Sequence, residues 1–129
     1  MIYFSVDHVF QVSDKVYIGV ANKDSELSAA LERCVAFPED DPSLEYVLIE
    51  DACSVDATTA ILTSGSSPVA TFEFEAFQFS HSQAPISIEC DVSICEGDDC
   101  NVCQSGTRRR RAVNNKRTEK IKATIIAQN

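Results

Sequence analysis

The sequence predicts an all-β fold that is held together by disulfide bonds. Apolar and polar residues alternate with a period of two in several segments of the 129-residue chain, which is the pattern of half-buried β-strands. The chain also has six cysteines, an even number that is typical of disulfide-bonded domains from an oxidising compartment. A chain of this length can bury a sizeable core, so we expect one domain.

The N-terminal segment 2–12 alternates and predicts the first strand. Its apolar face includes Phe4, Phe10 and Val12. His8 falls on the same face, where a histidine is more often a packed ring than a ligand or a base. A turn at residues 13–14 precedes a second predicted strand at 16–20.

The next segment, 24–34, is ambiguous. Leu27, Leu31 and Cys34 have helical spacing, whereas the flanking segments have strand patterns, and we predict a strand. Two prolines and three carboxylates then predict a surface loop at 38–42. A short strand is predicted at 46–49.

The aromatic segment 72–79 changes phase midway. Phe72 and Phe74 share one parity, and Phe77 and Phe79 share the other. One extra residue near positions 75 and 76 would return all four rings to one face, so we predict a β-bulge there. The following apolar stripe at 86–94 predicts a core strand that points Cys90 inward.

Charge divides the chain into two parts. Residues 1–107 carry a net charge of −16, and residues 108–129 carry +7. The acidic part repels nucleic acid, so we expect no nucleic-acid partner. The basic tail can dock on the acidic part, although salt screens exposed charges beyond about 10 Å.

Four consecutive arginines follow the last cysteine: Arg108, Arg109, Arg110 and Arg111. Arg-X-Arg-Arg is the pattern that furin-like convertases cut, because an acidic protease cleft pairs with several guanidinium groups. The alternatives are a solvated charge run or a nuclear-localisation patch. We interpret the run as a processing site, which divides the chain into a domain at 1–107, a cleavage site at 108–111 and a propeptide at 112–129.

The tail beyond the arginines is polar and then weakly apolar. Its apolar residues are Ile121, Ala123, Ile125 and Ile126. Residues 123–127 can add as a strand to an open sheet edge of the domain and bury the isoleucines. The alternative is a disordered tail.

Metal binding is the alternative use of the cysteines. Cys95, Cys100 and Cys103 have the spacing of plant-type [2Fe–2S] ligands, but no fourth cysteine follows them. A zinc site made by Cys100, Cys103 and either His8 or His81 would lack a second closely spaced ligand pair. Disulfides remain the favoured interpretation, and six cysteines permit 15 connectivities.

Other site chemistry has little support in the sequence. The carboxylates at 39–41 and at 96, 98 and 99 could hold Ca²⁺, but no motif defines a coordination loop. Neither histidine lies near a catalytic pattern, and no glycine-rich phosphate loop occurs. We therefore expect no metal, no cofactor and no enzymatic activity.

The sequence shows neither a signal-peptide pattern nor an apolar run that is long enough to cross a membrane. If the protein is secreted, we expect this segment to belong to a longer precursor.

The order of these landmarks resembles one family. The segments are C-V-A-F-P at 34–38, Y-V-L-I-E-D-A-C-S-V-D at 46–56, F-E-F-E-A-F-Q-F at 72–79 and I-E-C-D-V-S-I-C at 88–95, followed by Cys100, Cys103 and R-R-R-R. In this order they resemble the ZP-C domain, the C-terminal half of a zona pellucida (ZP) module. The resemblance covers essentially residues 1–111.

The resemblance implies an immunoglobulin-like β-sandwich with three disulfides: Cys34–Cys90, Cys53–Cys103 and Cys95–Cys100. It also implies a secreted or matrix protein that forms filaments, such as those of egg coats, with its own ZP-N half and with other ZP-domain chains. A furin-like convertase would release the propeptide, whose hydrophobic patch blocks assembly; Ile121 and residues 123–127 are the candidates for that patch. The precursors in this family are usually membrane-anchored. The alternative role in the family is a ligand-binding module of a receptor or co-receptor ectodomain.

Overall fold

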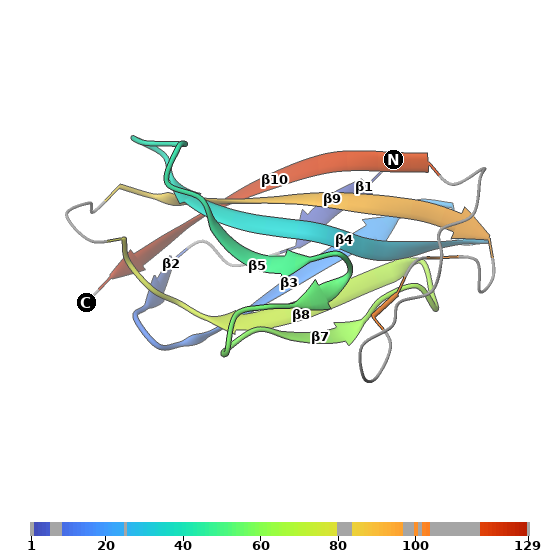
Figure 1. The fold of residues 1–129 in the computed structure, drawn as a ribbon, viewed down its shortest axis with the longest axis horizontal. Coiled ribbons are helices and arrows are strands. Elements are labelled where there is room, and N and C mark those ends of the chain that lie inside the picture. Colours follow the sequence, from blue (N-terminus) through green and yellow to red (C-terminus); the bar gives the residue numbers. More distant parts are fainter. Residues whose placement is uncertain are drawn as a thin grey trace.

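The structure is a computed structural model that describes residues 2–5, 9–24, 26–79, 84–96, 100, 102–103 and 117–128. These residues form ten β-strands in two sheets, and they include no helix (Figure 1). The predicted fold class is therefore confirmed: the chain is all-β, it carries three disulfides, and it is consistent with an immunoglobulin-like sandwich.

The smaller sheet has four strands. Their order is β1 (Ile2–Ser5), β3 (Lys15–Asn22), β8 (Val69–Glu75) and β7 (Ala60–Thr63), and all neighbours are antiparallel.

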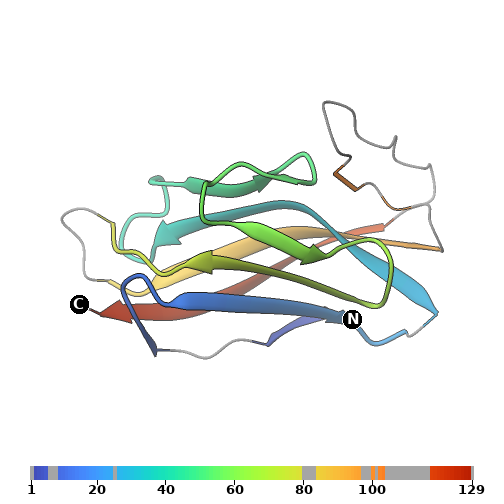
Figure 2. The same ribbon diagram turned by 90° about the horizontal axis from the view of Figure 1, so that it is seen from below.

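The larger sheet has six strands. Their order is β2 (Val9–Gln11), β10 (Arg117–Gln128), β9 (Ile86–Glu96), β4 (Leu27–Pro38), β5 (Tyr46–Glu50) and β6 (Cys53–Ser54). All neighbours are antiparallel except β2 and β10, which run parallel. Figure 2 shows the long β10 strand beside β9, with the C-terminus at the end of the molecule where β2 lies.

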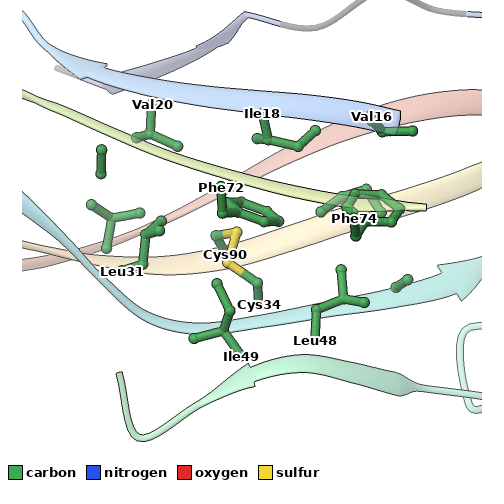
Figure 3. Packing of buried hydrophobic residues seen from close by; sticks show 14 of the residues in the cluster. Val16, Ile18, Val20, Leu31, Cys34, Leu48, Ile49, Phe72, Phe74 and Cys90 are labelled. Carbon is green, nitrogen blue, oxygen red and sulfur yellow. A yellow bond between two sulfur atoms is a disulfide. The ribbon is translucent and has the colours of Figure 1, made fainter. Parts of the chain in front are cut away.

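The core lies between the two sheets. Ile18, Phe72 and Phe74 come from the smaller sheet, and their side chains are fully buried against residues of the larger one. Figure 3 shows the Cys34–Cys90 disulfide among these side chains, between Phe72 and β5. Each such apolar side chain contributes roughly 1.5–3 kcal/mol when it is buried, so this layer is the main source of stability.

The ambiguous segment is a strand, as predicted. In β4 the pairing register with β9 shifts between Leu31 and Arg33. This bulge places Leu31 and Cys34, three residues apart, on the same core face. Ala30 is buried on the opposite face against Cys95 and Cys100. In a bulged strand that is buried on both faces, buried apolar residues can therefore lie three positions apart, which is also the spacing of a helix.

The prediction of one strand over residues 2–12 is wrong. The segment contributes β1 to the smaller sheet and β2 to the larger one. The alternation in the sequence runs through both strands, although they belong to different sheets. His8 lies outside the described residues, as does His81.

The predicted bulge near residues 75 and 76 is also wrong. Strand β8 ends at Glu75, and the backbone of Ala76 bonds instead to the turn at Ser13 and Asp14. Phe72 and Phe74 are fully buried, whereas Phe77 and Phe79 are partly buried at the margin of the core. The phase change marks the place where the strand ends.

Candidate functional site

Strand β10 is the C-terminal strand of the described chain, yet it lies inside a sheet (Figure 1). Its antiparallel ladder with β9 runs from the pair Arg117 and Ile94 to the pair Ile125 and Ile86. On its other side, Ile126 pairs with Val9 of β2 in the parallel direction. Removing β10 would thus open the whole edge of β9 and leave β2 without its neighbour. The segment expected to add at a sheet edge does so over 12 residues.

From Ile121 onward, the inward face of β10 is apolar. Ile125 is fully buried, Ala127 is nearly so, and Ile121 packs partly buried against the core. Ala123 is half-buried between them. Ile126 points outward and is 39% exposed, so the expectation that all the isoleucines are buried is wrong for this residue. The cause is the period-two alternation of a strand, which sends neighbours such as Ile125 and Ile126 to opposite faces.

The outward face of β10 carries two lysines. The ammonium of Lys120 lies 2.9 Å from a carboxylate oxygen of Asp91 and 3.6 Å from one of Glu89. The ammonium of Lys122 lies 3.8 Å from a carboxylate oxygen of Glu39 and 5.7 Å from the centre of the Phe37 ring. The hydrogen bond to Asp91, with the nearby charges of Asp91 and Glu89, raises the pKa of Lys120, so this lysine is charged at neutral pH.

These ion pairs are not among the contacts predicted from the sequence. The sequence pattern that points toward them is the alternation of Lys120 and Lys122 with Ile121 and Ala123. This alternation gives the tail one basic and one apolar face. The alternation predicts a strand, but it does not reveal which carboxylates face the lysines.

A side chain from another part of the protein fastens the far end of β10. The side-chain amide nitrogen of Gln78 donates a hydrogen bond to the backbone carbonyl oxygen of Ala127 over 2.7 Å. Gln78 follows β8, so this bond connects β10 to the segment that leaves the smaller sheet.

The six cysteines form Cys34–Cys90, Cys53–Cys103 and Cys95–Cys100, the same pairs that the resemblance implies. The first joins β4 to β9 inside the core, the second fastens β6 to the chain beyond β9, and the third closes a short loop at the end of β9. A cysteine in a disulfide is not a thiolate ligand, so the pairing contradicts the iron–sulfur and zinc alternatives.

The tetra-arginine run, Arg108–Arg111, lies outside the described residues, and so do Asp98 and Asp99. In the acidic loop after β4, Glu39 contacts the hydroxyl of Ser87, and Asp41 accepts bonds from Ser43. Within the described part of the chain, no group of three or more metal-ligating side chains is placed to hold an ion.

An aromatic cavity of about 490 Å³ opens at the end of the sandwich near the C-terminus of β8. Tyr46, Phe77 and Phe79 line it, with ring centres 5.4 Å apart for the first two and 5.2 Å apart for the last two. The hydroxyl of Tyr46 donates to the carboxylate of Asp56 at the rim, which raises the pKa of Tyr46.

Across the described residues, no helix has the length and apolar character that a membrane span requires.

Comparison with known proteins agrees with this architecture. The family model of the ZP-C domain matches residues 2–104. The chain is 32% identical over 100 residues to human CUB and zona pellucida-like domain-containing protein 1, and 30% identical over 110 residues to mouse alpha-tectorin. These alignments cover 73% and 78% of this chain but only 16% and 5% of the relatives. The chain belongs to the zona pellucida family, and residues 2–104 are its ZP-C domain.

Proposed function

We propose that this chain is the ZP-C half of an extracellular structural protein whose polymerisation is controlled by cleavage at Arg108–Arg111. In this proposal β10 is the propeptide strand, and it occupies the place in the sheet that assembly requires. The partners are the ZP-N half of the same protein and other ZP-domain chains, and the role is structural rather than enzymatic.

The observation that carries the proposal is the position of β10. A strand that follows an arginine-rich segment lies between β9 and β2 and buries Ile125 in the core. An open edge of a sheet presents unpaired backbone groups that pair readily with another chain. A strand held in that place protects the edge, and its loss makes the edge available.

Cleavage acts on the tether and leaves the contacts of β10 in place. Before cleavage β10 competes as an intramolecular strand, and its covalent link to the domain can give it an effective concentration in the mM range. After cleavage the same strand competes only at its bulk concentration. A cut between residues 111 and 112 therefore makes β10 replaceable by a strand from a partner chain.

The experiment expresses the full-length precursor in convertase-containing cells and compares it with an Arg111→Ala variant. We expect the parent to lose the segment from residue 112 onward, as read by intact mass, and to form filaments visible by electron microscopy. The variant should fold, retain all three disulfides and remain unassembled. Normal filaments from the uncut variant would refute the proposal.

The second candidate is a ligand-binding module in a receptor or co-receptor ectodomain. The observation in its favour is the aromatic cavity lined by Tyr46, Phe77 and Phe79. Evidence for this role would be a monomeric or dimeric ectodomain that binds a ligand saturably and forms no filaments after cleavage.

A further inference from the structure

Three carboxylates border the place that β10 occupies: Glu89 and Asp91 on the outward face of β9, and Glu39 just after β4. The ion pairs that the structure describes for them all lead to β10, from Lys120 to Glu89 and Asp91 and from Lys122 to Glu39. The side chains of Glu89 and Asp91 are only 29% and 30% exposed, so solvent screens their charges less than those of fully exposed groups.

The order along the ladder is specific. Lys120 lies opposite Asp91, and Lys122 lies opposite Glu89. Ile121 lies between the two lysines and packs against the core. The occupied site therefore matches a strand with the pattern basic, apolar, basic, and a shift by one residue would turn the lysines inward.

Two of the three basic residues in segment 1–107 form ion pairs with carboxylates elsewhere. Lys15 pairs with Glu73 in the smaller sheet. Arg33 follows the bulge of β4 and lies opposite Asp91 in the ladder, but its guanidinium bonds to Glu45 and Glu50. Without β10, the three carboxylates would lose these ion pairs within a segment, 1–107, of net charge −16.

We propose that the edge occupied by β10 selects its strand by charge. It accepts an antiparallel strand of a second ZP-domain chain that presents two basic residues, two positions apart, to Glu39, Glu89 and Asp91, with an aliphatic residue between them facing the core. This inference rests on the proposed function, and it adds the chemistry of the partner strand.

The pattern also limits where that strand can come from. Residues 1–107 contain three basic residues, Lys15, Lys23 and Arg33, and no two of them are two positions apart. The run Arg108–Arg111 would place an arginine in the core position, where an unpaired charge is costly. The selected strand therefore lies outside residues 1–111 of a second copy.

The first test uses the full chain, cut by convertase at Arg108–Arg111, with both pieces kept together. A labelled synthetic peptide of residues 112–129 is added, and exchange is followed by fluorescence anisotropy. Reversing both lysines in the peptide (K120E and K122E) should weaken its competition with the bound β10 strand by about tenfold to a hundredfold. The reason is that attraction between opposite charges becomes repulsion between like charges.

A control peptide carries the same change in charge at Lys116 and Arg117, because Arg117 lies opposite Ile94 rather than a carboxylate. It should compete nearly as well as the parent peptide. A chain with E89K and D91K should reverse the preference, and 0.5 M salt should reduce the difference. Equal competition by the charge-reversed peptide, or an equal loss for the control peptide, would overturn the proposal.

A second measurement separates this inference from the proposed function. In the uncut chain, K120E with K122E and E89K with D91K form a double-mutant cycle that is read by urea unfolding. We expect the combined variant to recover at least about fivefold in the folding equilibrium constant relative to additivity. Lack of coupling would overturn the charge selection, whereas failure of the convertase to cut would overturn only the cleavage mechanism.

Discussion

Lys120 of β10 and Asp91 of β9 face each other across the sheet, with 2.9 Å between the ammonium nitrogen and a carboxylate oxygen. The Lys120 side chain is 60% exposed, and an exposed pair typically stabilises a fold by only about 0–1 kcal/mol. The larger effect of this pair is on which strand can bind beside β9, because a negative residue in the place of Lys120 would be repelled by both Asp91 and Glu89. The pair therefore contributes more to the choice of strand than to the stability of the domain.

Replacing Ile125 with Ala should destabilise the domain far more than replacing its neighbour Ile126. Ile125 is fully buried, so its truncation leaves a cavity and should lower the free energy of unfolding by about 2–4 kcal/mol. Ile126 is exposed on the other face, and its change should stay within about 0.5 kcal/mol. Urea unfolding of the two variants measures the difference, and equal effects would show that β10 is not seated in the register described.

Replacing Gln78 with Met should loosen the C-terminal end of β10. This change keeps the size of the side chain but removes the hydrogen bond to the carbonyl oxygen of Ala127, which is worth about 0.5–1.5 kcal/mol. Amide hydrogen exchange should accelerate near residues 125–128 and stay unchanged near Lys120. Uniform acceleration along β10 would indicate global rather than local destabilisation.

The stability that Asp56 contributes should depend on pH. Partial burial raises the pKa of Asp56, but hydrogen bonds from Thr58, Tyr46 and Thr59 outweigh this effect and hold its pKa below the ordinary value. Because the folded pKa is lowered, the stabilisation is present above the unfolded pKa, near 4, and is lost as the pH falls through the folded pKa.

Asp56→Asn should therefore reduce the free energy of unfolding by about 1 kcal/mol at pH 7 and by much less near pH 2. Unfolding curves at several pH values measure this difference. Glu26→Gln, at an exposed position before β4, serves as the comparison. A deficit for Asp56→Asn that did not shrink in acid would mean that its charge is not the source of the stabilisation.

The core disulfide should contribute more stability than the short-loop disulfide. Cys34 and Cys90 are 56 residues apart, and Cys95 and Cys100 are 5 apart. Loop-closure entropy of the unfolded chain predicts contributions of about 4 and about 2 kcal/mol. Two variants test which disulfide contributes more: in each, both cysteines of one disulfide are replaced by Ala, and stability is measured by thermal or urea unfolding. Intact mass before and after reduction should show the gain of six hydrogens in the parent chain.

Much of the strand content follows from the sequence alone. Alternation of apolar and polar residues is a local property, so it located β3, β5 and β9 before any pairing was known. The alternation led to wrong predictions where two different strand arrangements are compatible with the same local pattern. The phase change near Ala76 marks the end of β8, and the alternation over residues 2–12 continues through two strands in different sheets.

The sequence by itself determined the β class, the parity of most buried side chains and the division into an acidic domain and a basic tail. Only the tertiary structure decided that β10 lies between β9 and β2, that Ile125 is buried while Ile126 is not, and that Lys120 faces Asp91. The physical reason is that side-chain alternation is set within one strand. Strand neighbours and charge partners depend instead on contacts between residues far apart in the chain, such as the 29 positions that separate Asp91 from Lys120.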